Sequence, residues 1–143
     1  MNDIIKNFQN IKSSISNNNV NIIAVSKTFS FDTIKPLIDY GHLHFGENKV
    51  QEAKTKWLTT KKENSKLQLH MIGKLQSNKA KDAVELFDFI HSVDNEKLAT
   101  ALAKYENLLS KKKKYFIQVN IGNENQKSGI RKTQLSEFYS FCQ

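Results

Sequence analysis

A lysine that follows a short apolar run is the residue best suited to covalent chemistry in this sequence. In the segment IAVSK at 23–27, the alternation of a β-strand places Ile23, Val25 and Lys27 on one face. We therefore expect the Lys27 amine to end a row of buried apolar side chains, shielded from water, where the neutral amine is favoured over the ammonium ion. Only a neutral amine attacks an aldehyde to form a Schiff base. The plainer interpretation is a surface lysine whose stem lies along apolar neighbours.

Polar residues also stand where the other predicted strands end. Asn48, His70, Asp94 and Asn120 lie at or near the points where apolar runs stop. In parallel α/β folds, ligands and chemistry collect at the carboxyl ends of the strands. These residues are therefore candidates for one site. The plainer interpretation is that such residues cap the helices that follow, and we favour it for Asp94.

The elements that position these residues are read from the spacing of apolar side chains. Residues 1–17 have the spacing of an amphipathic helix. Five further steps of strand and helix follow without hairpin signals, which predicts a parallel sheet, open or closed into a barrel. The strand runs are almost continuously apolar, as is typical of strands covered on both faces. We predict strands at 21–25, 42–45, 67–72, 89–93 and 115–121, and helices at 31–40, 50–60, 78–86, 95–110 and from 133 onward.

Composition limits the class of protein. The chain has 143 residues and a single cysteine, Cys142, so an intrachain disulfide and a zinc site built on cysteines are excluded, and a reducing cytoplasm is expected. No stretch approaches the roughly 20 apolar residues of a membrane span. The sequence thus favours one cytoplasmic domain, 1–143, with no membrane partner.

The net charge of +8 raises the question of nucleic acid. The lysines are spread along the chain and alternate with acidic residues, except for the run Lys111–Lys114. We expect that run to be a solvated helix end. A specific nucleic-acid partner is not expected, because no motif with interleaved aromatic residues accompanies the charge.

Four sequence blocks occur in a fixed order along the chain. They are IAVSKT at 23–28, FGEN at 45–48 with VQE at 50–52, HMIG at 70–73 with LQSNK at 75–79, and VN at 119–120 followed by Glu124 and 127–129. In this order, over about residues 21–130, they resemble the pyridoxal phosphate homeostasis protein family. That family is related to the N-terminal barrel of alanine racemase.

The resemblance implies a TIM-type barrel that binds pyridoxal 5′-phosphate (PLP). Lys27 matches the lysine that holds PLP as an internal aldimine, and Asn48 matches a position beside the cofactor. His70 and Ile72 resemble part of the wall along the ring. The family implies a non-catalytic carrier that keeps cellular PLP in balance, with PLP-dependent apoenzymes as possible partners. The alternative is a PLP enzyme of the alanine racemase kind.

The sequence departs from the family pattern in three ways. Lys49 stands where the family commonly has Tyr, and Lys74 where it commonly has Pro. A complete eight-stranded barrel takes about 250 residues, so five strands predict a partial α/β barrel that lacks the C-terminal βα units and their phosphate-binding segment. We therefore expect weakened PLP affinity, and open edges that favour self-association or a complementary fragment. A remnant with weak or no cofactor binding is the further alternative.

Overall fold

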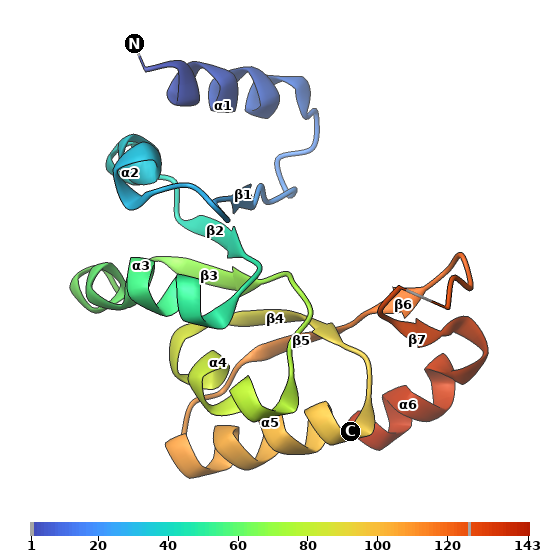
Figure 1. Ribbon diagram of the computed structural model, residues 1–143. Coiled ribbons are helices and arrows are strands. Elements are labelled where there is room, and N and C mark those ends of the chain that lie inside the picture. Colours follow the sequence, from blue (N-terminus) through green and yellow to red (C-terminus); the bar gives the residue numbers. More distant parts are fainter. Residues whose placement is uncertain (1, 126) are drawn as a thin grey trace.

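A parallel β-sheet organises the chain, for which a computed structural model describes residues 2–125 and 127–143. Its five strands lie in the order β1-β2-β3-β4-β5, so each strand pairs with its neighbour in sequence (Figure 1). Every pairing is parallel. The strands are β1 (Ala24–Val25), β2 (His44–Glu47), β3 (Gln68–Met71), β4 (Phe89–Val93) and β5 (Lys114–Ile117).

Helices connect consecutive strands, as expected for parallel pairing. Local signals fix their ends: the Ser30 side chain caps α2 through the Thr33 amide, and Gly41 ends that helix with a φ of 109°. The helices are α1 (Asp3–Ser14), α2 (Phe31–Tyr40), α3 (Val50–Glu63), α4 (Ala80–Leu86), α5 (Glu96–Leu109) and α6 (Leu135–Cys142), with short 3₁₀ turns η1 (Ser77–Lys79) and η2 (Lys132–Gln134).

The core lies between the sheet and its helices. Phe45, Leu69 and Ile90 on the sheet are fully buried, and the Trp57 ring of α3 lies 4.9 Å from the Phe45 ring. Such a core is expected where the apolar stripe of each helix covers one sheet face. The predicted class is confirmed: an α/β fold that forms part of a TIM-type barrel, with a leading helix and a five-stranded parallel sheet.

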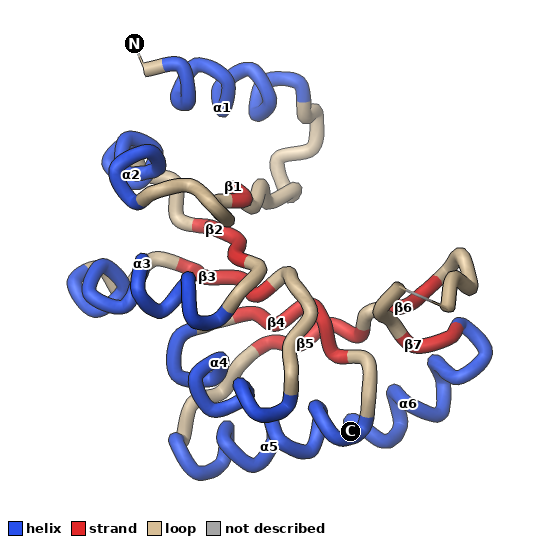
Figure 2. The backbone as a smooth tube through the Cα atoms, viewed as in Figure 1, coloured by secondary structure: helices blue, strands red, loops and turns tan. Residues whose placement is uncertain are grey.

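The sheet remains open, with β1 and β5 at its edges (Figure 2). On the face opposite α3, Val25 and Phe116 are each 49% exposed. The apolar runs predicted strands covered on both faces, which is wrong for this face, whereas an exposed inner face is what a partial barrel predicts. In a closed barrel, strands on the opposite side of the barrel would cover this face. The five strands of this sheet do not close, so the face stays open.

The predicted fifth strand is two strands. β5 ends at Ile117, and β6 (Val119–Asn120) pairs with β7 (Ile130–Arg131) in a separate two-stranded sheet. Gln118 joins the two sheets, because its amide donates to the Val93 carbonyl at 2.9 Å and its carbonyl accepts from the Ile130 amide at 2.8 Å. The apolar run in the sequence continues through this break, which explains why the prediction merged the strands.

Asp94 does not cap α5, contrary to the prediction. The cap is Asn95, whose side chain accepts from the Leu98 amide at 2.8 Å. Asp94 instead accepts from the amide of Gly129 at 3.0 Å, so its carboxylate ties the end of β4 to the loop before β7.

The lysine run Lys111–Lys114 begins just after α5, and three of its four residues are exposed, as expected for a solvated helix end. α5 ends at Leu109, whereas Lys114 is the first residue of β5, and burial lowers the pKa of Lys113.

Among the described residues, no helix is long and apolar enough to cross a membrane.

Candidate functional site

The register of the first three strands brings the predicted site residues to one level. Val25 pairs with Gly46, and Gly46 pairs with His70. Because side chains alternate along a strand, the next residues on the same face lie two positions further on. Those residues are Lys27, Asn48 and Ile72. Each of the three lies just past the end of its strand, Lys27 in a turn and Asn48 in a bend, so their alignment in one row extends the strand alternation and stays a prediction, whereas His70 lies within β3.

Lys27 occupies the turn that follows β1. The turn is closed by a hydrogen bond from the Phe29 amide to the Ser26 carbonyl at 3.3 Å. The Ser26 side chain is buried toward α3, and Lys27 is exposed. The expectation that Lys27 is shielded from water is therefore wrong, because nothing in the described chain covers the sheet face to which its row belongs.

Asn48 is held by a close approach of two backbone segments. An ideal Cβ on Gly73 would lie 2.3 Å from the carbonyl oxygen of Asn48 and 2.8 Å from its Cα. Only glycine fits there. Beside it, Ile72 donates its amide to the Glu47 carbonyl at 2.9 Å, and its side chain packs over Gly46. Because Gly73 has no side chain, its backbone can lie directly against the Asn48 backbone, and the chain segments that follow β2 and β3 stay in contact.

Replacing Gly73 with alanine is expected to destabilise the chain by about 2 kcal/mol or more, since overpacking against backbone costs about 1–3 kcal/mol. The measurement is the midpoint of urea unfolding. Gly122→Ala is the matched control, because an ideal Cβ there comes no closer than 3.6 Å, to the flexible Glu124 side chain. Equal midpoints for the two variants would show that the contact is not as tight as described.

His70 belongs to a chain of three imidazoles on the open face. Its two ring nitrogens hydrogen-bond His44 at 3.0 Å and His91 at 2.9 Å. The His70 ring also stacks on Phe89, with centroids 4.3 Å apart and planes within 7°. Both nitrogens are thereby occupied within the sheet. The predicted place of His70 in a wall along the cofactor ring stays a prediction, and both ring nitrogens are committed to neighbouring rings.

The environment of His70 and His91 favours neutral imidazoles. Burial, and then the neighbouring His91 and His44, lower the pKa of His70 to about 4. Burial also lowers the pKa of His91. Both shifts favour the neutral form of these two rings, because burial disfavours the imidazolium ion.

A buried ion pair lies under the Lys27 turn, and the sequence interpretation missed it. Glu47, at the end of β2, is fully buried, and the Lys56 side chain on α3 is only 8% exposed. The Lys56 ammonium lies 3.1 Å from the Glu47 carboxylate, which also accepts from the Trp57 indole at 3.1 Å and from the Ser26 hydroxyl. A sequence signal existed: Glu47 shares its strand face with Phe45, the face that the helices cover.

A hollow of about 290 Å³ lies at the carboxyl ends of β2 and β3. Asn48 lines it together with three lysines, Lys49, Lys74 and Lys79. Two of these lysines are the departures from the family pattern noted above. They make the rim beside Asn48 basic, which favours an anionic ligand.

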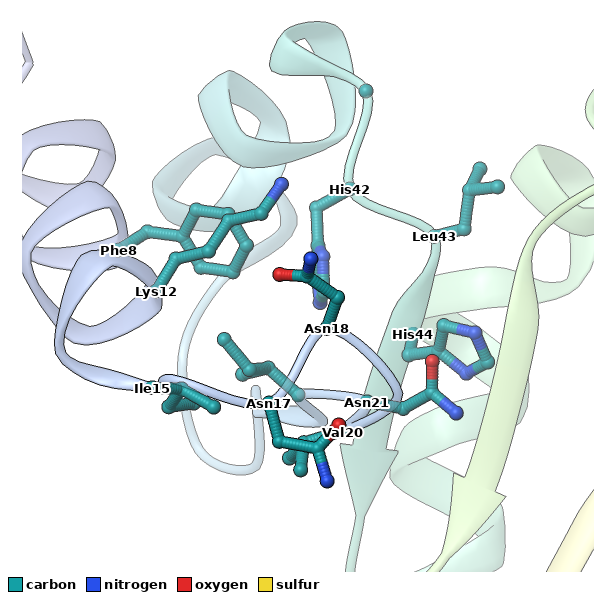
Figure 3. Close-up of a pocket in the computed structure, with 12 residues that line it drawn as sticks. Phe8, Lys12, Ile15, Asn17, Asn18, Val20, Asn21, His42, Leu43 and His44 are labelled. Atoms are coloured by element: carbon teal, nitrogen blue, oxygen red, sulfur yellow. The ribbon is translucent and has the colours of Figure 1, made fainter.

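A second hollow, of about 340 Å³, lies at the opposite end of β2 (Figure 3). Lys12, Asn18 and His42 line it, and the His42 Nε2 atom is buried without a hydrogen-bond partner. Burial lowers the pKa of His42. This hollow is separate from the Lys27 row, because His42 precedes β2 and Asn48 follows it.

The fold and the row at the strand ends define a class of protein. The whole chain, residues 1–143, matches the family described as alanine racemase, N-terminal domain, and the chain belongs to that family. Within it, the resemblance predicted from the sequence blocks is confirmed. A pyridoxal phosphate homeostasis protein from Buchnera aphidicola subsp. Schizaphis graminum (strain Sg) is 44% identical over 111 residues, covering 78% of this chain and 48% of the relative.

The protein of the same name from Escherichia coli (strain K12) is 36% identical over 147 residues, covering 96% of this chain and 63% of the relative. Solved structures of PipY from Synechococcus elongatus PCC7942 are also similar. The structure without PLP is 36% identical with a TM-score of 0.86, and the structure with PLP bound is 34% identical with a TM-score of 0.82. The chain covers 63% and 64% of those two proteins.

Alanine racemase from Clostridium difficile 630 has the same fold over 95% of this chain, with a TM-score of 0.73 and 13% identity. That likeness concerns the fold alone. The chain spans about half to two thirds of the length of the curated relatives above.

Proposed function

We propose that this chain binds PLP through Lys27 and serves the balance of cellular PLP, as the names of its relatives state for them. The observation that supports the proposal is the strand register: β1, β2 and β3 end side by side, and Lys27, Asn48 and Ile72 follow within two residues of those ends. PipY, the relative whose structure contains PLP, is 34% identical to this chain.

The residues present fit the reactive part of PLP. The Lys27 amine is exposed on the open side of the sheet, so an aldehyde reaches it without a rearrangement of the fold. The Ile72 side chain packs over the glycine at position 46 and offers an apolar contact to a planar ring. The hollow lined by Asn48, Lys49, Lys74 and Lys79 does not include Lys27, and its basic rim suits an anionic group such as phosphate.

When bound, PLP supplies an aldehyde that condenses with a lysine amine and releases one water. The chain's own contribution is to present the Lys27 amine, to place the Asn48 amide at the same level, and to supply the apolar surface of Ile72. His70 contributes its stacked ring to the wall and carries no free nitrogen for proton transfer, since both nitrogens bond neighbouring rings.

The role we propose is that of a carrier without turnover. A PLP enzyme needs a second acid–base group facing the lysine, and the hydrogen bonds of His70 leave it unsuited to that role. Delivery to PLP-dependent apoenzymes in the cytoplasm, and pairing of the β1 and β5 edges with a second copy or a complementary fragment, remain predictions. An enzyme of the alanine racemase kind would instead racemise alanine above the rate of free PLP.

Substituting Lys27 with alanine is expected to abolish the covalent adduct that borohydride fixes after incubation with PLP. The measurement is peptide mapping of the reduced protein by mass spectrometry, with the absorbance of the PLP adduct followed before reduction. Lys62→Ala is the matched control, because Lys62 is an exposed lysine on α3 outside the row. A wild-type map without label at Lys27, or a K27A variant that keeps the absorbance, would refute the proposal.

A further inference from the structure

The turn that carries Lys27 contains a strained residue. Thr28 has a φ of 66°, in the left-handed region that β-branched residues rarely adopt. Such a conformation persists only where the surrounding structure holds it in place. Contacts that hold Thr28 therefore also determine the direction in which the adjacent Lys27 leaves the sheet.

Two charged side chains of α3 attach the turn at both ends. The Glu52 carboxylate accepts a hydrogen bond from the Thr28 amide at 2.7 Å. The Lys56 ammonium donates to the Ser26 carbonyl at 2.7 Å, and it also lies 3.5 Å from Glu52. Lys27 stands between these two attachment points. Both bonds involve an ionised partner, and such bonds are about twice as strong as neutral ones.

A rigid base supports these attachments. Lys56 is fixed by the fully buried Glu47 carboxylate at 3.1 Å, and Glu47 in turn is held by the Trp57 indole. The strained turn is thus connected through named bonds to the buried part of α3.

We propose that Glu52 and Lys56 are positioning residues that hold the Ser26–Phe29 turn so that Lys27 faces its ligand. This proposal rests on the proposed function, because it assigns these residues to the lysine that binds PLP. Neither side chain contacts the ligand in this scheme. Each acts through the backbone on either side of Lys27.

Glu52→Ala is the primary test, since Glu52 is partly exposed and its loss leaves the buried Glu47–Lys56 pair intact. We expect the Thr28 amide of the protein without PLP to exchange with solvent at least about tenfold faster, the factor for losing one charge-assisted bond. The share of borohydride-fixed PLP label found at Lys27 should fall at least about threefold, with label on other lysines unchanged. Glu63→Ala, an equal loss of charge at the exposed end of α3, should match wild type in both measurements.

A second substitution separates positioning from general loosening. Thr28→Gly removes the strain at φ 66°, because glycine adopts the left-handed region freely. In the Glu52→Ala background it should restore most of the Lys27 label. Unchanged Thr28 exchange in Glu52→Ala overturns the proposal, and so does faster exchange with an unchanged Lys27 share. If wild type shows no label at Lys27 while Thr28 exchange still responds to Glu52→Ala, the proposed function fails and the attachment of the turn to α3 stands.

Discussion

Replacing Lys56 with methionine is expected to destabilise the protein by about 3–5 kcal/mol, the usual cost of leaving one partner of a buried ion pair alone. Glu47 is fully buried and Lys56 is 8% exposed, so water cannot replace the lost ammonium. The Ser26 hydroxyl and the Trp57 indole still donate to the carboxylate but do not neutralise it. Unfolding in guanidinium chloride, followed by circular dichroism, measures the change.

Two comparisons show that the effect comes from the charge left behind. Lys54→Met, on the same helix, removes a pair with Asp82 whose side chains are 39% and 33% exposed, and it should cost about 0–1 kcal/mol. The double variant Glu47→Gln with Lys56→Met should be more stable than Lys56→Met alone, because no buried charge remains. Similar losses for Lys56→Met and Lys54→Met would contradict the buried-pair interpretation.

Much of the fold could be predicted because local patterns and tertiary structure agree. Alternating apolar runs and helical stripes gave the order of the elements, and Ser30 and Gly41 marked the ends of α2 as they do in the structure. The break between β5 and β6 could not be predicted in the same way. Gln118 is one polar residue within an apolar run, and its role depends on bonds to Val93 and Ile130, which lie far away in sequence.

For the candidate site, the sequence named residues but not their environment, and the membership of Lys27, Asn48 and Ile72 stays a prediction. Strand alternation identified the row of Lys27, and the sequence blocks added Asn48 and Ile72. The exposure of Lys27 depends on what covers the open face, and alternation carries no information about that. The Glu47–Lys56 pair depends on how α3 crosses β2. Lys56 lies three residues after Ala53 and one before Trp57, both of which are buried. This spacing is consistent with an inward side chain but does not identify Glu47 as its ion-pair partner.

The histidine cluster was missed because the rings come from three separate strands. Only His70 lay in a recognised block, whereas His44 and His91 were read as ordinary strand residues. Their contact follows from the sheet register and from the side-chain rotamers. These place a ring nitrogen of His44 3.0 Å, and a ring nitrogen of His91 2.9 Å, from the nitrogens of His70. The cluster gives the fold a dependence on pH that composition does not indicate.

Stability is expected to fall by about 2 kcal/mol between about pH 7 and pH 5, through His70 alone. Burial lowers its pKa from 6.5 to about 4 in the folded chain, while the unfolded chain keeps the ordinary value. Below about pH 6.5 the unfolded state therefore binds a proton at His70 that the folded state does not bind. The free energy of unfolding thus decreases as the pH falls toward 4, and the His70 contribution is constant above about pH 7. His42 and His91, whose pKa values burial also lowers, act in the same direction.

Urea unfolding at a series of pH values measures this loss, and His70→Phe provides the comparison. The variant keeps an aromatic ring against Phe89 but cannot titrate, so its stability should fall less steeply over the same range, whatever its absolute value. Because burial is the main cause, the slope of wild type should persist in about 0.5 M sodium chloride, where interactions between exposed charges are largely screened. Equal slopes for wild type and His70→Phe would show that the cluster is not buried in solution, and that the open face of the sheet admits water to its imidazoles.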